Sequence, residues 1–281
     1  MIGATPTGGF YSGPGVTDGG DGATYNFDPA AAGVGTHTIT YDFTDANGCA
    51  VRTTDDVEVF ALPNVTFSAP ADLCSEAGVQ TGLGGGAPTG GVYSGPGVTD
   101  DGNGMTYSFN PAAADVGVHT ITYTLTDANG CTASASDDVE VFPLPIVGFT
   151  APADLCIDAG VQTGLGGGTP PEGTETGDLG VYSGDGVTDD GNGMTYSFDP
   201  AAAGIGVHTI TYTYTDENGC TDSASDDIEV FDFPVVTFTA PGDLCIDSGV
   251  HTGLGCVLPT GGSYTGDGVT DDGNGMTYSF D

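Results

Sequence analysis

Residues 119–126 read His-Thr-Ile-Thr-Tyr-Thr-Leu-Thr. The isoleucine, tyrosine and leucine alternate with threonines, and such alternation of β-branched and aromatic residues is typical of a strand with one buried face. The next four residues, Asp-Ala-Asn-Gly at 127–130, favour a tight turn. The chain then returns through 132–142, where Val139 and Val141 fall on one face. These residues therefore predict a β-hairpin with an apolar face and a threonine-rich face.

The hairpin belongs to a unit that repeats along the chain. Its His-Thr-Ile-Thr-Tyr pattern begins at His37, His119 and His208. A second segment, Gly-Val-Thr-Asp followed by a Gly/Asn-rich turn and Thr-Tyr-x-Phe, occurs four times, and each copy is preceded by a tyrosine: Tyr11, Tyr93, Tyr182 and Tyr264. The steps between these tyrosines are 82, 89 and 82 residues. A fixed period of this size indicates an array of similar domains. The longer step reflects an insertion at 169–180, which its Gly/Pro/Thr-rich composition places in a surface loop.

Each full unit contains about seven short strands, with turns every 8–12 residues, and this pattern predicts an immunoglobulin-like (Ig-like) sandwich. Besides the hairpin, the expected strands of one unit are 65–68, 79–83, 92–94 and 105–109, and 112–114 forms at most one helical turn. The expected fold class is all-β, with tandem Ig-like β-sandwich domains forming an elongated array.

Short proline-containing segments separate the units, and we expect domain boundaries near Pro63, Pro145 and Pro234. Such linkers are stiff. The expected domains are a partial Ig-like repeat at 1–62, an Ig-like repeat at 63–144, an Ig-like repeat with a loop insertion at 145–233 and a partial Ig-like repeat at 234–281. They are numbered repeats 1 to 4 below. The truncated first and last repeats suggest a window from a longer protein or a continuous fibre.

The charge of the chain is extreme. Its 281 residues include 39 Asp and Glu, no Lys, and one Arg, Arg52, which gives a formal net charge of −38. This balance excludes nucleic acid and anionic membrane surfaces as electrostatic partners. It favours cations, above all Ca²⁺, which prefers hard oxygen ligands. The sequence contains no apolar run long enough to span a bilayer, so we expect no membrane insertion in this segment.

The acidic turn Asp-Asp-Gly-Asn-Gly is the candidate Ca²⁺ site, because it places carboxylates and an amide oxygen on a glycine-rich backbone. The other interpretation is a solvated hairpin turn. The candidate ligands are Asp100, Asp101, Asn103, Asp189, Asp190, Asn192, Asp271, Asp272 and Asn274. A second acidic group, Asp137, Asp138 and Glu140, approaches a linker and is a candidate for an inter-domain ion.

Seven cysteines indicate an oxidising compartment. Six fall at repeated positions, after Asn-Gly or after Asp-Leu, and Cys256 is the odd thiol. The favoured pairing lies within a repeat and joins Cys74 to Cys131 and Cys156 to Cys220. A rival pairing crosses the repeat boundaries and joins Cys49 to Cys74, Cys131 to Cys156 and Cys220 to Cys245. Spacing alone leaves both open.

Other polar residues carry weaker signals. The repeated histidine at the start of each hairpin has no recurring partner of metal-ligand spacing, which favours a hydrogen-bonding role at a strand edge. The threonine row is either the exposed side of a strand or a flat glycan- or ice-binding face. No catalytic triad, carboxylate pair or phosphate loop stands out, so the sequence predicts a protein that is not an enzyme.

Three motifs together resemble a known family. They are Gly-Gly-x-Tyr-Ser-Gly-x-Gly-Val, Phe-Asp-Pro-Ala-Ala-Ala-Gly-x-Gly-x-His-Thr-Ile-Thr-Tyr and Thr-Asp-x-Asn-Gly-Cys. The chain resembles, over essentially its whole length, the tandem Ig-like/PKD-like repeats of very large secreted surface proteins of Bacteroidota. The resemblance implies adhesins or gliding-associated filaments exported by the type IX system.

These observations predict a structural, non-catalytic segment of an extracellular surface filament or adhesin stalk of a bacterium, either attached to the cell surface or secreted. The expected partners are neighbouring copies of the same chain in a fibre, with surface glycans as a further partner class. The alternative function is a ligand-binding array that recognises glycans or ice.

Overall fold

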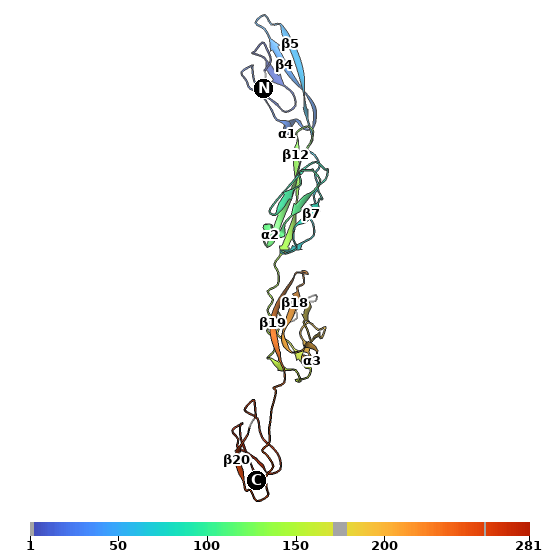
Figure 1. The fold of residues 1–281 in the computed structure, drawn as a ribbon. Coiled ribbons are helices and arrows are strands. Elements are labelled where there is room, and N and C mark those ends of the chain that lie inside the picture. The colour runs from blue at the N-terminus through green and yellow to red at the C-terminus, as the bar shows by residue number, and fades with distance from the viewer. Residues whose placement is uncertain (1–2, 171–178, 256) are drawn as a thin grey trace. The chain divides into compact units, whose positions relative to one another are not determined.

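The structure is a computed structural model that describes residues 3–170, 179–255 and 257–281. The fold is all-β and consists of tandem Ig-like β-sandwich repeats (Figure 1). The chain divides into two compact units, Met1–Leu144 and Pro145–Asp281. The backbone is irregular at Pro63, Pro145 and Pro234, where no strand passes through the proline. The exact domain boundaries at these prolines stay a prediction.

Repeat 2 contains a full set of strands. Their bounds are β6 (Leu73–Cys74), β7 (Gln80–Leu83), β8 (Val92–Ser94), β9 (Val98–Asp100), β10 (Tyr107–Phe109), β11 (Gly117–Thr126) and β12 (Thr132–Phe142), with one helical turn, α2 (Pro111–Ala114), between β10 and β11. They form a four-stranded sheet in the order β6-β12-β11-β8 and a three-stranded sheet in the order β7-β10-β9. All these pairings are antiparallel except that of β6 with β12.

Repeat 3 has the same arrangement. Its elements are β13 (Leu155–Cys156), β14 (Gln162–Leu165), β15 (Leu179–Ser183), β16 (Val187–Asp189), β17 (Tyr196–Phe198), α3 (Pro200–Ala203), β18 (Gly206–Thr215) and β19 (Thr221–Phe231). The sheet orders, β13-β19-β18-β15 and β14-β17-β16, match those of repeat 2 strand for strand. Most of the predicted loop insertion at 169–180 lies outside the described residues.

Repeats 1 and 4 each contain part of this set, and both include counterparts of β9 and β10. Repeat 1 holds β1 (Phe10–Ser12), β2 (Val16–Asp18), β3 (Tyr25–Phe27), α1 (Pro29–Ala32), β4 (Gly35–Thr44) and β5 (Ala50–Val59). Repeat 4 holds β20 (His251–Leu254), β21 (Val269–Asp271) and β22 (Tyr278–Phe280). Residues 234–281 align with the part of repeat 2 that precedes the hairpin formed by β11 and β12.

The hairpin prediction is confirmed. The strands β11 and β12 pair in one continuous register from Gly117 opposite Val141 to Thr126 opposite Thr132. Ile121, Tyr123 and Leu125 of β11 are buried, as are Val139 and Val141 on β12. Ile121 and Val139 form the centre of a core to which Tyr93, Tyr107, Phe109 and Tyr123 also belong. The alternation of the sequence therefore directs one face of the hairpin into the sandwich.

The strand expected at 65–68 is wrong. The structure has an isolated bridge there, between Thr66 and Ala87. The partner segment is a glycine run at 84–86 that ends in Ala87-Pro88. Glycine has no side chain to pack and proline cannot donate to a ladder, so pairing does not extend beyond one bridge. The single helical turn near 112–114 is confirmed as α2.

Candidate functional site

An aromatic cluster organises each repeat. In repeat 2, the ring centroid of Tyr93 lies 4.5 Å from that of Tyr107, 4.6 Å from that of Tyr123 and 5.9 Å from that of Phe67. In repeat 3, the ring centroid of Tyr182 lies 4.6 Å from that of Tyr196, 4.7 Å from that of Tyr212 and 5.9 Å from that of Phe149. Such close, tilted or stacked pairs contribute beyond the apolar area that they bury. The repeated tyrosines are therefore core residues and do not form a ligand-stacking surface.

The hydroxyl of Tyr123 explains a pair of glycines in the repeat. It accepts a hydrogen bond from the Gly91 N–H (2.7 Å) and donates one to the carbonyl of Pro88 (2.6 Å). The ring fits because Gly86 and Gly91 have no Cβ; a Cβ at either position would lie about 2.5 Å from a Tyr123 ring atom. Gly86 and Gly91 are thus required by the close approach of the backbone to the ring.

Tyr107 and Tyr196 differ from the other cluster tyrosines. Both are fully buried, and their hydroxyls have no hydrogen-bond partner among the described residues. Burial raises the pKa of each to about 12. Each phenol is therefore neutral at physiological pH and contributes an unsatisfied donor to the core, which carries a free-energy cost.

The acidic turns use their side chains as caps for the backbone. In repeat 2, Asp100 accepts hydrogen bonds from the N–H groups of Tyr93 (2.7 Å) and Gly102 (2.8 Å). Asn103 accepts two from Met105 and Thr106, both 2.8 Å. Asp101 accepts from the hydroxyl of Thr106. All three predicted Ca²⁺ ligands of this turn are thus hydrogen-bond acceptors that hold the turn between β9 and β10.

The same pattern of hydrogen bonds recurs in two further turns. One contains Asp189, Asp190 and Asn192, and the other contains Asp271, Asp272 and Asn274. Hydrogen bonds from the N–H groups of Tyr264 and Gly273 lower the pKa of Asp271. Within the described residues, no group of three or more His, Cys, Asp or Glu side chains is arranged to hold a metal ion. Ca²⁺ binding at these turns stays a prediction.

The second acidic group ties the first segment of each repeat to its last strand. Asp137 accepts a hydrogen bond from the Ala69 N–H (3.0 Å), and Asp72 accepts one from the Glu140 N–H (2.8 Å). In repeat 3 the Ala151 N–H donates to Asp226 (2.9 Å) and lowers its pKa. These carboxylates therefore fasten an irregular segment to β12 or β19 within one repeat.

The repeated histidine has the predicted hydrogen-bonding role. Nε2 of His119 lies 2.7 Å from the carbonyl oxygen of Asp115, and His37 and His208 make the same contact with Gly33 and Gly204. Each contact closes the backbone between the helical turn and the hairpin strand that follows it.

The predicted disulfide pairing within a repeat is wrong. Cys131 and Cys156 are free thiols, as are Cys49 and Cys245, whereas Cys74 and Cys220 are each disulfide-bonded. The reason is the length of the last strand. Cys74 lies opposite Phe142 at the end of β12, while Cys131 directly precedes the start of that strand. The 11 residues between them span about 36 Å, and a disulfide needs Cα atoms within about 7 Å.

The rival pairing is also wrong, since each of its three bonds includes at least one of these four free thiols. The remaining cysteine, Cys256, lies outside the described residues.

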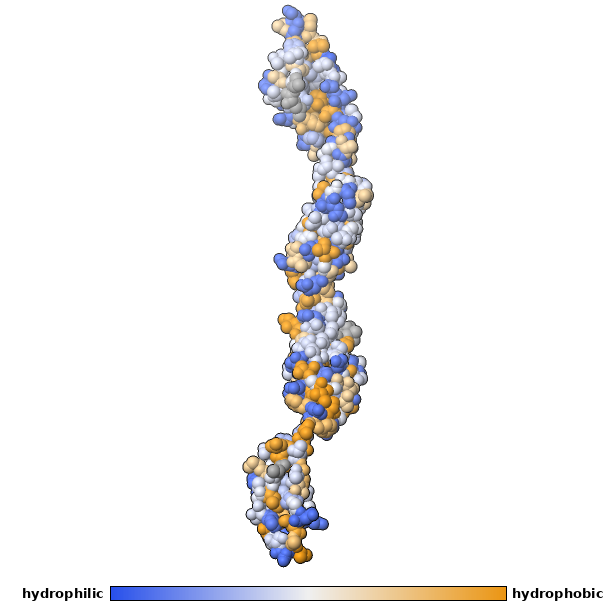
Figure 2. All heavy atoms as spheres, in the orientation of Figure 1, coloured by the Kyte–Doolittle hydropathy of each residue, from blue (hydrophilic) through white to orange (hydrophobic). Residues whose placement is uncertain are grey.

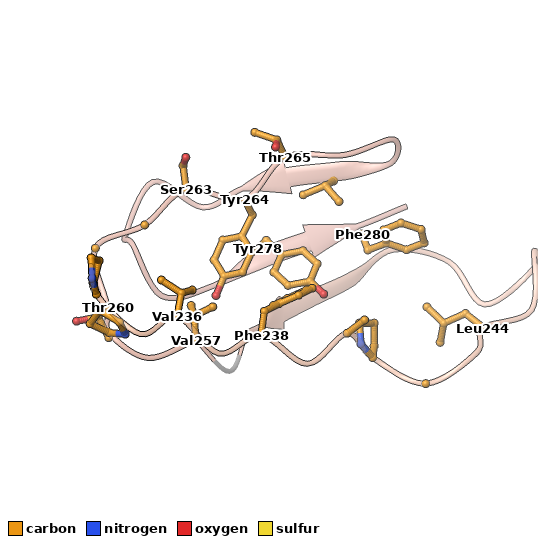
Figure 3. A pocket seen from close by; sticks show the side chains of 18 residues that line it. Val236, Phe238, Leu244, Val257, Thr260, Ser263, Tyr264, Thr265, Tyr278 and Phe280 are labelled. Carbon is orange, nitrogen blue, oxygen red and sulfur yellow. The ribbon is translucent and has the colours of Figure 1, made fainter. Parts of the chain in front are cut away.

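An apolar groove opens in repeat 4 (Figure 3). Val236, Phe238 and Leu244 line one side of it, and Tyr264, Tyr278 and Phe280 lie across from them. The equivalent residues of repeat 2, Val65, Phe67 and Leu73, pack against a core that includes the hairpin. The groove is therefore the inner face of a sandwich core without the hairpin that covers it in repeats 2 and 3.

The threonine face of the hairpin is partly to fully exposed and internally hydrogen-bonded. The Thr122 and Ser136 hydroxyl oxygens are 2.9 Å apart, those of Thr126 and Thr132 are 2.8 Å apart, and Thr120 donates to Asp138. Over the visible face of the molecule, hydrophilic and hydrophobic residues are interspersed (Figure 2). Among the described residues, no helix has the length and apolar character needed to cross a membrane.

Comparisons with known proteins gave matches among solved structures. No family model and no curated protein matches the chain. The chain is similar to a Ca²⁺-stabilised adhesin that helps an Antarctic bacterium bind ice, with 19% identity over 83% of this chain and 68% of that one and a TM-score of 0.37.

It is also similar to a 1.5-MDa bacterial ice-binding adhesin (14% identity, 80% and 88% coverage of this chain and that one, TM-score 0.32). A third similar structure contains the fibronectin(III)-like modules of Clostridium thermocellum CbhA (17% identity, 60% and 95% coverage, TM-score 0.31).

Proposed function

We propose that this chain is a structural, non-catalytic segment of an extracellular bacterial surface filament or adhesin stalk. The observation that carries the proposal is the strand-for-strand and ring-for-ring identity of repeats 2 and 3. The repeated side chains build cores, cap turns and close strand edges. A unit copied in this way, with its polar residues used for its own backbone, suits a spacer that gains length by duplication.

The finer assignment rests on the sequence resemblance to Ig-like/PKD-like repeats of Bacteroidota surface proteins, with domain boundaries at Pro63, Pro145 and Pro234. We expect neighbouring copies of the same chain as partners in a fibre. Electron microscopy of the purified chain tests this function. Fibres whose axial period matches one repeat, about 40 Å if β12 runs along the axis, support it, and a monodisperse globular particle contradicts it.

Ca²⁺ stabilisation is a second part of the proposal. Folding concentrates 39 carboxylates against one arginine, so an ion bound only by the folded state adds stability, about 2.7 kcal/mol at a hundredfold excess over its dissociation constant. Thermal unfolding in EGTA and in millimolar Ca²⁺ at fixed ionic strength tests it, with Mg²⁺ as control. A Ca²⁺-specific rise that Asp101→Asn reduces supports an ion at the turn. Equal melting in Ca²⁺ and EGTA contradicts it.

A ligand-binding array is the alternative, and the exposed threonine face of each hairpin favours it. Inhibition of ice recrystallisation and binding to a glycan array measure these two activities directly. Substitution of Thr120 and Thr126, which are exposed, by Lys reduces either activity if the face binds. A spacer retains its fold and shows neither activity before or after the change.

A further inference from the structure

In repeat 2, the last strand of the sheet has only a short neighbour on one side. The strand β12 lies between β11 and β6. β11 pairs with it from Thr132 to Val141, whereas β6 pairs only with Val141 and Phe142. Over residues 132–140, β12 therefore has a neighbouring strand on one side only. Its other side is an unpaired sheet edge, and such an edge is a template for a further strand.

Alternate residues of β12 direct their backbone groups toward this edge. In an antiparallel pair, the N–H and C=O of one residue point to one side, and those of the next residue point to the other. The N–H of Glu140 points to the unpaired side, because it donates to Asp72, directly before β6 (2.8 Å). Counting back in steps of two, the other residues that face this side are Asp138, Ser136, Ser134 and Thr132.

The acidic half of this edge is blocked and the other half is not. The N–H groups of Asp138 and Glu140 both donate to carboxylates. Among the described residues, the N–H groups of Ser134 and Ser136 have no partner, and both residues are exposed. Charged side chains are a common defence against further pairing at a strand edge, and residues 132–136 contain none. These five residues are called the open edge.

Repeat 3 blocks the equivalent edge. The sequences of β19 and β12 differ at two positions, and at one of them Asp222 replaces Ala133. The carboxylate of Asp222 accepts a hydrogen bond from the N–H of Ser223, the counterpart of Ser134, at 2.8 Å. The middle of this edge is therefore both charged and capped.

In repeat 1 the equivalent edge carries a cation. Arg52 of β5 takes the place of Ser134, and its Nε lies 2.7 Å from a carboxylate oxygen of Asp42. Pairing of this edge with itself would bring two arginines together, and like charges directly opposite each other are destabilising. Among the three hairpins of the described residues, the uncharged and uncapped edge is thus confined to repeat 2.

We propose that the open edge of repeat 2 pairs with the open edge of a second copy of this chain. The pairing is antiparallel about a two-fold axis at Ser134. Thr132 of one copy then lies opposite Ser136 of the other, and all three outward-facing residues exchange backbone hydrogen bonds. The proposal rests on the proposed function, because it names one contact between neighbouring copies in a fibre.

Charge selects this partner and this direction. Two copies with a net charge of −38 each repel one another, and the uncharged edge is where their backbones can approach. A basic partner would be attracted to the acidic half of the strand instead. In the antiparallel arrangement, Asp137 and Asp138 of one copy lie level with Cys131 and Gly130 of the other. A parallel arrangement would place each carboxylate beside its own counterpart, which is destabilising.

Amide exchange resolved by residue tests the proposal on the full chain. It is measured at increasing chain concentration in about 1 M NaCl, where the Debye length is about 3 Å and repulsion between copies is screened. Exchange at Ser134 and Ser136 should slow as the concentration rises. Exchange at Ser225, the counterpart of Ser136 in repeat 3, should not change. If Ser134 shows no concentration dependence up to the solubility limit, or if Ser225 slows equally, the proposal is wrong.

One substitution copies the block that repeat 3 already contains. Ala133→Asp should retain the fold, as Asp222 does in repeat 3, and should lose the concentration dependence at Ser134. The control is Thr99→Asp, at an exposed residue of β9 in the other sheet, which adds the same charge and should leave the dependence intact. Circular dichroism checks the β fold of both variants. Concentration dependence that persists in folded Ala133→Asp overturns the proposal.

The reverse change gives repeat 3 an open edge. Glu217 and Asp222 occupy the positions of Ala128 and Ala133, so a double substitution of both by Ala removes the charges that distinguish the two edges. Exchange at Ser223 should then become dependent on concentration. No gain in the folded double variant contradicts the proposal.

Pairing through one repeat needs no fibre, so the two proposals can fail separately. Protection at Ser134 without fibres contradicts only the fibre. Fibres without protection at Ser134 contradict only the edge pairing.

Discussion

Repeats 2 and 4 place the same aromatic rings in nearly the same way but bury them differently. In repeat 2 the ring centroids are 5.9 Å apart for Phe67 and Tyr93 and 4.5 Å apart for Tyr93 and Tyr107. In repeat 4 the corresponding distances are 6.1 Å for Phe238 and Tyr264 and 4.6 Å for Tyr264 and Tyr278. Phe238 nevertheless remains 54% exposed and Val236 63% exposed. The short strands thus set the positions of the rings, and the hairpin provides their burial. Since burial of apolar area is the main favourable term in folding, the hairpin decides the stability of a repeat.

The largest expected effect comes from making repeat 2 resemble repeat 4. Ile121→Asp puts an unpaired carboxylate into the fully buried centre of the hairpin face and should destabilise the repeat by about 4 kcal/mol. Hydrogen exchange resolved by segment measures the loss in β11 and β12. The control is Thr126→Asp, at an exposed residue of the same strand, which should change stability by less than about 1 kcal/mol. Equal losses of stability in the two variants contradict the conclusion that burial of the hairpin's apolar face determines the stability of a repeat.

The reverse experiment gives repeat 4 its hairpin. Residues 200–233 appended after Asp281 should cover Val236, Phe238 and Leu244. Full burial of such a side chain contributes about 1.5–3 kcal/mol, so covering three partly exposed ones should slow exchange in β20 and β22 by an amount equivalent to about 3 kcal/mol. The same extension with Ile210→Asp in the appended copy is the control. Unchanged exchange with the unmodified extension shows that the groove is not an uncovered core.

The sequence predicted the hairpin and its buried face because alternation is a local property of each strand. It did not predict that Cys131 is a free thiol, because the distance between Cys131 and Cys74 depends on the full length of β12. The acidic turns were also incompletely predicted. Their composition suits both a Ca²⁺ ligand set and a capped turn, and only the backbone geometry shows that Asp100 and Asn103 accept the N–H groups of their own turn. The strand at 65–68 failed because its partner is a glycine run that the pattern of 65–68 itself does not reveal.

A smaller effect distinguishes the two kinds of tyrosine within the covered core. Tyr107→Phe removes a buried hydroxyl for which the described part of the chain provides no partner and should stabilise repeat 2 by about 1 kcal/mol. Tyr123→Phe removes the acceptor of the Gly91 N–H and the donor to Pro88 and should destabilise it by about 1–2 kcal/mol. Both variants retain the ring, so segment-resolved exchange isolates the hydroxyl. Loss of stability in Tyr107→Phe indicates a partner for that hydroxyl.

The smallest expected effect is the pH dependence of the acidic turn in repeat 4. The N–H groups of Tyr264 and Gly273 lower the pKa of Asp271 in the folded state. A lowered folded-state pKa means that the unfolded chain binds the proton more tightly, so the stabilisation is fully present above the ordinary carboxyl pKa of about 3.9 and is lost as the pH falls through the folded value. Exchange in β21 and β22 should therefore accelerate, at matched intrinsic rates, as the pH falls below about 4. Asp271→Asn should flatten this dependence and lower stability at pH 6, because an amide accepts the two N–H groups less well than a carboxylate. The control is Asp243→Asn, at an exposed carboxylate for which the described part of the chain shows no hydrogen bond. If the Asp271→Asn variant and the unsubstituted chain respond equally to pH, the prediction is wrong. The acid sensitivity of repeat 4 then comes from its overall charge and not from the hydrogen bonds that Asp271 accepts.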